Sequence, residues 1–244
     1  VKGTPGHGSM PREDQAIHKL ALALSRLGHQ KLPVHVTEPV KAMVEAIANV
    51  QPMVGKLGLK AMLQPLLTES VIDSLPDKGI ARAFNALLHN TAVATVVRAG
   101  TKTNVIPSTA EAEIDGRVLP GYTKEQFLAE LKAVLCDEIE LVVIREAPPL
   151  EVPPESELVE AIRAGLKRAD PEGAVVPYVV PGFTDGFAFA QLGTKFYGFA
   201  PIFFPEKPAV SFTELFHGDD ERIPVEGFQK GLECFLDVVR SFCT

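Results

Sequence analysis

The sequence predicts a protein of mixed class, with an α+β part followed by an α/β part. Helical spacing comes first in the chain and is followed by strand-like runs, a second helix and a last short strand. Such an order gives paired strands with helices on one face of the sheet. A proline-rich stretch at 148–154 is the strongest boundary signal in the chain. Beyond it, strands and helices alternate, which is typical of part of an α/β layer.

The first part contains two regions of helical spacing. Residues 11–27 place Ile17, Leu20 and Leu24 on one face of an amphipathic helix. Residues 38–88 are rich in Ala, Leu and Met and are interrupted by prolines, which favours several short helices over one long helix.

The strands of the first part follow this helical region. Residues 93–99 are β-branched, and residues 110–118 alternate apolar and charged side chains, as in a half-buried antiparallel strand. Thr123 and Gln126 form a capping box at the start of the next helix, and residues 139–144 are expected to form the last strand.

The second part begins after the prolines. A helix is expected around residues 158–166, strands at 175–180 and 196–199, and a final helix after Pro224.

Composition excludes several classes of protein. The chain has 244 residues and a formal charge of −7, with no basic run, which argues against a nucleic-acid partner. No apolar run is long enough to span a membrane. The three cysteines lie far apart and are read as free thiols in a reducing, cytoplasmic compartment.

Two polar clusters in the first part are candidates for chemistry. His7 lies between two glycines, which suits an imidazole that faces a ligand, although an exposed loop histidine would look the same. Asn104 lies in a turn between two expected strands, where it could bind a carboxylate or close the turn through its side chain.

Two further clusters lie in the second part. Gly182 and Thr184 precede an expected helix, where they could form an anion site, or Thr184 or Asp185 could simply cap the helix. Residues 217–222 contain five ionisable side chains in six positions, and His217 among carboxylates is a plausible zinc ligand. Nucleotide-binding and serine-nucleophile signatures are absent from the sequence.

Taken in order, these clusters resemble one family of enzymes. The matching segments are 6–11, 100–107, 115–117, 182–185, 197–199 and 217–223. They are similar to segments of the co-catalytic zinc aminoacylases, carboxypeptidases and desuccinylases of metallopeptidase clan MH. This group includes glutamate carboxypeptidase, succinyl-diaminopimelate desuccinylase and carnosinase-like dipeptidases.

The resemblance implies a domain organisation. Residues 1–146 match a four-stranded antiparallel lid, or dimerisation, domain with helices on one face, and residues 38–88 look like a helical insertion into it. Residues 147–244 match the C-terminal segment of an α/β zinc-peptidase catalytic domain. The chain starts without a methionine and lacks the family's first catalytic segment, so we expect it to be a fragment that is inactive alone.

The resemblance also implies roles for single residues. His217 corresponds to a ligand of the second of two zinc ions, with cobalt or manganese as alternative metals. His7 corresponds to a lid histidine that stabilises the oxyanion in the partner subunit of a homodimer. The substrate-binding positions are Asn104, Arg117, Gly182 and Thr184.

The implied activity is metallopeptidase or aminoacylase-type hydrolysis of an N-acyl amino acid or short peptide with a free carboxylate. Phe183 and Phe187 depart from the family pattern toward a more apolar pocket. Two alternatives stay open: a non-catalytic dimerisation or binding module of the same fold, and a degenerate relative whose ligands include Asp219 or Asp220.

Overall fold

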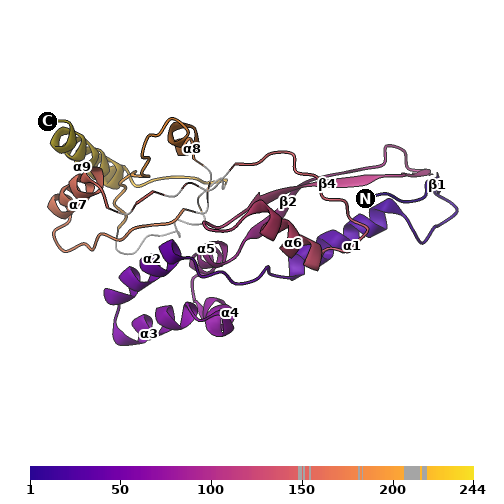
Figure 1. The fold of residues 1–244 in the computed structure, drawn as a ribbon, viewed down its shortest axis with the longest axis horizontal. Helices are drawn as coiled ribbons and strands as arrows, with labels where there is room; N and C mark the ends of the chain where they lie inside the picture. Colours follow the sequence, from indigo (N-terminus) through magenta and orange to yellow (C-terminus); the bar gives the residue numbers. More distant parts are fainter. Residues whose placement is uncertain are drawn as a thin grey trace. The chain divides into compact units, whose positions relative to one another are not determined.

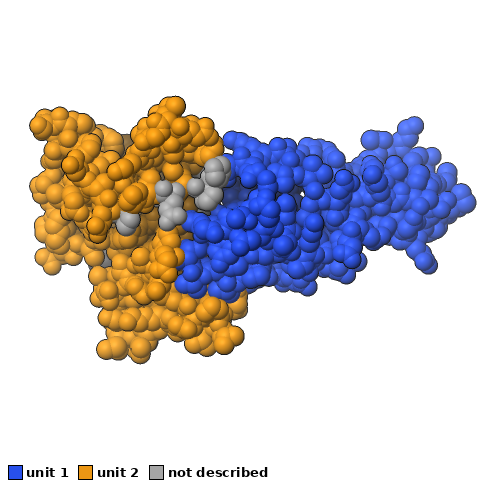
Figure 2. All heavy atoms as spheres, viewed as in Figure 1, with its two compact units in different colours: residues 1–37, 88–149 blue, residues 38–87, 150–244 orange. Residues whose placement is uncertain are grey.

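The structure is a computed structural model, and it divides into two compact units. It describes residues 1–147, 150, 152–153, 155–180, 182, 184–205, 215 and 219–244. Unit 1 comprises Val1–Thr37 and Leu88–Pro149, and unit 2 comprises Glu38–Leu87 and Leu150–Thr244 (Figure 2). The domain limits 1–146 and 147–244 stay a prediction from the sequence.

Unit 1 contains four strands in two antiparallel pairs. β2 (Thr91–Ala99) pairs with β4 (Ala110–Arg117), and β1 (Gly6–His7) pairs with β3 (Val105–Ile106). The chain start continues this arrangement, because the Val1 amino group donates to the Ala110 carbonyl at 2.9 Å. β4 forms where a strand was expected, but burial alternates only at its start, where Ala110 is buried and Glu111 exposed; residues 112–114 are all half-buried and residues 115–117 all exposed.

Two helices cover the same face of the β2–β4 pair (Figure 1). α1 (Ala16–His29) packs Ala16 and Leu20 against Ala110, and α6 (Lys124–Val134) packs Phe127 and Leu131 near Ala92. Gly116 of β4 leaves room for this contact, because an added Cβ would lie 2.6 Å from the Phe127 ring. The capping box of Thr123 and Gln126 is present at the start of α6. The mixed fold class, with helices on one face of antiparallel strands, is therefore confirmed.

The expected strand at 139–144 is not formed. Val142 and Ile144 are largely exposed, and no ladder among the described residues includes them. A β-branched run forms a strand only where a neighbouring strand accepts and donates its backbone hydrogen bonds. The sheets of unit 1 are accordingly two separate pairs rather than one four-stranded sheet.

A polar network in unit 1 closes the base of the helical segment 38–87. His35 Nε2 lies 2.6 Å from Glu130 Oε1, and Asn90 Nδ2 donates to Glu130 Oε2 at 2.9 Å. Asn90 Oδ1 in turn accepts the Leu119 amide. The His35 amide also donates to the Leu88 carbonyl at 2.7 Å, so the points where the chain leaves and re-enters unit 1 are bonded to each other. We call His35, Asn90 and Glu130 the clasp.

The helical segment forms four short helices, as expected. They are α2 (Glu38–Asn49), α3 (Met53–Met62), α4 (Pro65–Ser74) and α5 (Lys78–Leu88). Pro65 starts α4, where its missing N–H costs nothing. α2 packs on α3 and α3 on α4, and the helices bury Val40, Met43, Val44 and Met62.

The rest of unit 2 is helical where it is regular. α7 (Glu157–Ala169) packs on α9 (Val225–Cys243), and α8 (Gly186–Ala190) is a single short turn between them in sequence. The expected strands at 175–180 and 196–199 are not found in any ladder of the described part of the chain. A strand needs at least one neighbouring strand for its backbone hydrogen bonds, and the described residues of unit 2 provide none. Among the helices described here, none is long and apolar enough to cross a membrane.

Candidate functional site

His7 lies at the end of β1, at one tip of unit 1. Its register partner on β3 is Val105, and a turn closed by the Met10 amide and the His7 carbonyl follows it at once. The imidazole is exposed. This position leaves the ring free to enter a site outside its own unit.

Asn104 is brought next to His7 by the strand pairing. The Gly8 amide donates to the Asn104 carbonyl at 2.8 Å. An added Cβ on Gly8 would lie 3.3 Å from backbone atoms of Thr103 and Asn104, so the absence of a side chain permits this close approach. The turn before β3 is closed by the backbone, from the Val105 amide to the Lys102 carbonyl, and not by the Asn104 side chain. Two residues almost a hundred positions apart thus meet at one tip.

The hydrogen bonds of His7 fix its neutral tautomer. The Ser9 amide donates to His7 Nδ1 at 3.2 Å, and the Ser9 hydroxyl lies 2.7 Å from the same nitrogen. An Nδ1 that accepts an N–H carries no proton in the neutral ring, so the proton lies on Nε2. His7 can therefore offer an Nε2–H donor to a developing negative charge.

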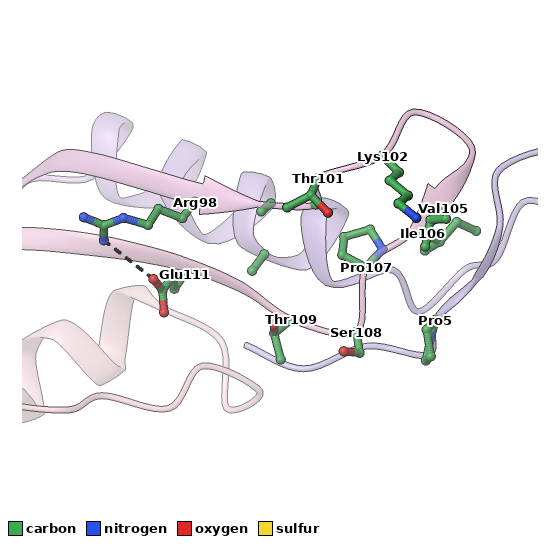
Figure 3. Close-up of a pocket in the computed structure, with 13 residues that line it drawn as sticks. Pro5, Arg98, Thr101, Lys102, Val105, Ile106, Pro107, Ser108, Thr109 and Glu111 are labelled. Atoms are coloured by element: carbon green, nitrogen blue, oxygen red, sulfur yellow. Dashed lines mark ion pairs between the residues drawn. The ribbon is translucent and has the colours of Figure 1, made fainter.

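A hollow of about 560 Å³ lies beside this tip, lined by residues of unit 1 between Pro5 and Glu111 (Figure 3). Arg98 pairs there with Glu111 and Glu113 across the strands. Lys102 also lines the hollow, and the figure shows its side chain turned toward Val105 and Pro107. The sequence reasoning did not single out this hollow, because its walls come from two strands and a turn whose register only the structure reveals.

Arg117 lies far from His7 within unit 1. It is the last residue of β4, paired in register with Thr91, whereas Asn104 follows the other end of β2. Arg117 Nη2 forms an ion pair with Asp115 Oδ2 at 2.8 Å, and both side chains are about half exposed. The structure therefore brings His7 and Asn104 together and places Arg117 at the opposite end of the β2–β4 pair.

The candidate carboxylate loop lies in unit 2, before α8. The Thr184 hydroxyl accepts the Gly186 amide at 2.9 Å, while the N-cap residue of α8, Asp185, makes no side-chain cap hydrogen bond. Phe187 lies in the first turn of that helix. Gly182 has open space around its Cα, where an added Cβ would meet only Val180, at 3.5 Å. Thr184 thus contacts the first amide of α8 from the residue before the N-cap, and a carboxylate-binding role stays a prediction.

His217 lies outside the described residues, as does Phe183. Of the same cluster, Asp220 pairs with Arg222, and Asp219 is exposed. In the part of the chain that the structure describes, no three His, Cys, Asp or Glu side chains converge on a point where a metal could bind. The described residues therefore do not fit a zinc site by themselves.

Comparison with known proteins adds three findings. Residues 1–142 match the model of a family described as a peptidase dimerisation domain. The chain is 28% identical to N-fatty-acyl-amino acid synthase/hydrolase PM20D1 of Homo sapiens over 247 residues, which cover 99% of this chain and 47% of the human protein. It is 23% identical to probable carboxypeptidase S-like 2 of Dictyostelium discoideum, over 97% of this chain and 44% of that protein. The chain thus spans about half the length of these curated relatives.

Proposed function

Because this chain belongs to the family of M20 peptidase dimerisation domains, we propose that the full-length protein is a hydrolase that cleaves the amide bond of an N-acyl amino acid or short peptide with a free carboxylate. The observation that carries the proposal is the meeting of His7 and Asn104 at one exposed tip of unit 1. The names of two relatives, a synthase/hydrolase of N-fatty-acyl amino acids and a carboxypeptidase-like protein, support amide-bond hydrolysis.

We propose a hydrophobic acyl group in the substrate. Seven of the 14 phenylalanines of the chain fall in residues 183–204, around the Gly182 and Thr184 loop. Phe189 and Phe196 stack there with ring centroids 6.5 Å apart, and Phe189 is half exposed. Neighbouring phenylalanine side chains favour an acyl chain, because each methylene group buried against them contributes about 0.8 kcal/mol of transfer free energy. The fatty-acyl amino acids in the relatives' names are substrates of this kind.

In this proposal His7 donates its Nε2–H to the oxyanion that forms as water adds to the amide carbonyl. A preorganised donor of this kind is worth roughly 2.7–4 kcal/mol of transition-state stabilisation. Asn104 lies beside it and orients the substrate, while Arg117, Gly182 and Thr184 are assigned to the carboxylate. Arg117 ends β4 opposite Thr91, whereas His7 lies in the β1–β3 pair, beyond the other end of β2. The two residues therefore contact one substrate only if different subunits supply them.

We propose zinc as the metal of the full-length protein, with two ions per subunit and His217 as a ligand of one. Zinc would polarise the scissile carbonyl and acidify a bound water. Among the described residues of this chain, no three side chains could together hold a metal ion. We therefore assign these residues no role as metal ligands in the reaction. Most of the ligands then come from sequence outside this chain, which agrees with the doubled length of the relatives.

A homodimer is part of the proposal, because the matched family is a dimerisation domain. β2 pairs with β4 along one edge, and no strand among the described residues pairs with its other edge. Val93 on this strand is more than half exposed. An edge strand of this length is a ready surface for a second copy.

The α9 helix supports the view that a further segment completes the catalytic part. Seven apolar side chains of α9 are 40–70% exposed: Val225, Phe228, Leu232, Phe235, Leu236, Val239 and Phe242. An apolar face of this size needs a covering partner in a stable soluble fold. We propose that the first catalytic segment of the full-length protein covers it.

The decisive experiment assays the full-length protein on N-acetyl-leucine, N-dodecanoyl-leucine and a dipeptide, with metal content measured by elemental analysis. We expect free leucine to be released, faster from the dodecanoyl substrate, with loss of activity on chelation and recovery with zinc. A metal-free dimer without turnover of any of the three substrates would instead support a non-catalytic binding module.

A further inference from the structure

We propose that the helical segment 38–87 docks on an anionic lipid surface through α3 and the start of α4. This inference goes beyond the proposed hydrolase function and uses none of the residues assigned to it. The docking surface consists of Val50, Met53, Val54, Leu57, Leu66 and Leu67 together with Lys56 and Lys60. We call these residues the lysine–apolar surface.

Exposure is the first observation behind this proposal. Val54 is 84% exposed, Leu66 96% and Met53 70%, in a segment that buries other apolar side chains well. Met62 of the same helix α3 is fully buried, so α3 is packed on its other side. Side chains this apolar are left in water only at a cost, unless a partner covers them.

The geometry of α3 sorts these side chains onto one side. At about 100° per residue, Met53, Leu57 and Val54 cover an arc of about 100° around the helix axis. Met62 lies on the side of the helix opposite Met53. Lys60 and Lys56 follow on the adjoining flank of the same arc. A helix with apolar residues between its core side and a lysine flank is typical of segments that lie in the plane of a membrane interface. The lysine stems can extend along the apolar surface while their ammonium groups reach lipid phosphates.

The charges of residues 46–68 indicate that the lipid surface is anionic. The whole chain carries −7, yet from residue 46 to residue 68 the only charged side chains are Lys56 and Lys60. Acidic residues resume at Glu69, one turn into α4. Because acidic side chains are missing from this stretch, an anionic lipid headgroup meets no repulsion there.

A second copy of the chain fits this surface less well. In a two-fold contact the same patch faces itself, which would bring the lysines of both copies close to one another without a carboxylate on the surface to offset them. The clasp also holds the two ends of the segment together, with the Val34–His89 bridge and the His35–Leu88 hydrogen bond at its base. The segment therefore leaves and re-enters unit 1 at one place.

The test uses sedimentation of the full-length protein with vesicles of equal parts phosphatidylcholine and phosphatidylglycerol, and with pure phosphatidylcholine. We expect binding to the mixed vesicles, weakened by salt and weak on the neutral ones. Both Lys56→Glu/Lys60→Glu and Val54→Ser/Leu57→Ser should lower the affinity about tenfold or more, in line with ~1 kcal/mol per basic residue at a lipid surface.

Matched control variants alter exposed side chains of the same types elsewhere. They are Val142→Ser/Ile144→Ser for apolar exposure and Lys132→Glu/Lys195→Glu for charge, and both should bind vesicles as the wild type does. Circular dichroism verifies that each variant is folded. The proposal is overturned if the wild type does not bind the mixed vesicles, or if the test variants bind them unchanged. It is also overturned if the controls weaken binding equally, or if Val54→Ser/Leu57→Ser changes only self-association.

Discussion

His7 is the residue whose assignment rests most directly on local geometry. The Ser9 amide and hydroxyl both address Nδ1, which leaves Nε2–H as the outward donor. In the full-length protein, His7→Ala should lower the catalytic rate by roughly 10²–10³, the usual cost of one oxyanion donor. Metal content should not change, because the imidazole acts on the transition state. Steady-state kinetics with elemental analysis measure both quantities.

His18 provides the matched control for this prediction. It is an exposed histidine on α1, and His18→Ala should leave turnover unchanged. Equal turnover in His7→Ala and wild type would refute the oxyanion assignment. A loss of bound metal in His7→Ala would show that the residue belongs to the metal site instead.

Two of the three cysteines, Cys234 and Cys243, should differ sharply in reactivity. Cys234 is buried on α9, and burial raises the pKa of its thiol, with the nearby Asp237 acting in the same direction. Cys243 is exposed. At mildly alkaline pH, a thiol-reactive dye should therefore label Cys243 rapidly and Cys234 slowly, because the thiolate is the nucleophile. Cys243→Ser should remove the fast phase, and Cys234→Ser should leave it intact.

The same shift gives a sign for the pH dependence of stability. Because the pKa of the Cys234 thiol is raised in the folded state, its protonated form stabilises the fold. This stabilisation is complete below the thiol pKa of the unfolded chain, about 8.5, and is lost as the pH rises through the folded-state pKa. Wild type should therefore lose stability above that pH relative to its own neutral value, and Cys234→Ala should lose less. Urea denaturation of both proteins across the alkaline range measures this difference. A larger alkaline loss of stability in Cys234→Ala than in wild type would contradict a raised Cys234 pKa.

Residue types predicted the tip only in part. The glycines around His7 and the turn around Asn104 were visible in the sequence, but their meeting depends on the β1–β3 register, which nothing in the local composition specifies. Thr184 shows the reverse case. Its position before a helix fits either capping or anion binding, and the structure shows its hydroxyl accepting the Gly186 amide, next to the N-cap residue Asp185.

At the scale of elements, the clasp bonds together the parts of unit 1 that flank the helical segment in sequence. Asn90 is buried and satisfies both Glu130 and the Leu119 amide, so Asn90→Ala leaves two buried polar groups unpaired. We expect a loss of about 1–3 kcal/mol in the free energy of unfolding. Asn49→Ala, at the exposed end of α2, should change it by less than about 0.5 kcal/mol. Urea denaturation followed by circular dichroism measures both, and equal effects would rule out a special role for the clasp.

Helices were predicted well from the sequence, whereas strands were predicted only in part: the runs at 93–99 and 110–118 form β2 and β4, and three later runs form no strand among the described residues. Amphipathic spacing and caps are local signals, so α1, α6, α7 and α9 formed close to their expected positions, and the capping box of α6 is present. The runs at 139–144, 175–180 and 196–199 have strand-like composition but lack a neighbour among the described residues. Strand formation depends on partners far away in sequence, which a local pattern cannot reveal.

At the scale of the whole molecule, we expect residues 1–146 to mediate a two-fold dimer. The free edge of β2 and the exposed Val93 on it provide a surface for a second copy. Val93→Lys should weaken dimerisation, since a charge on an edge strand opposes pairing. Glu111→Lys, on β4, is the control for an added charge on the partner strand. Sedimentation of the full-length protein at tens of micromolar measures the dissociation, and an unchanged dimer in Val93→Lys would place the interface elsewhere.

His7 lies in the β1–β3 pair and Arg117 at the far end of the β2–β4 pair. This separation leads to a test of catalysis across the dimer. If His7 acts in the partner's site, a subunit with His7→Ala still carries an intact metal ligand, and a subunit with His217→Ala still carries an intact lid histidine. Each homodimer should be nearly inactive, but a mixed dimer unites one intact His217 with one intact His7 in a single site. Mixing the two variants after reversible dissociation should therefore restore turnover, up to about a quarter of the wild-type value, since half of the dimers are mixed and each has one working site. The glycines around His7 let its loop approach a neighbouring subunit closely. Verified mixed dimers that show no gain in activity would keep His7 as a donor only within its own subunit.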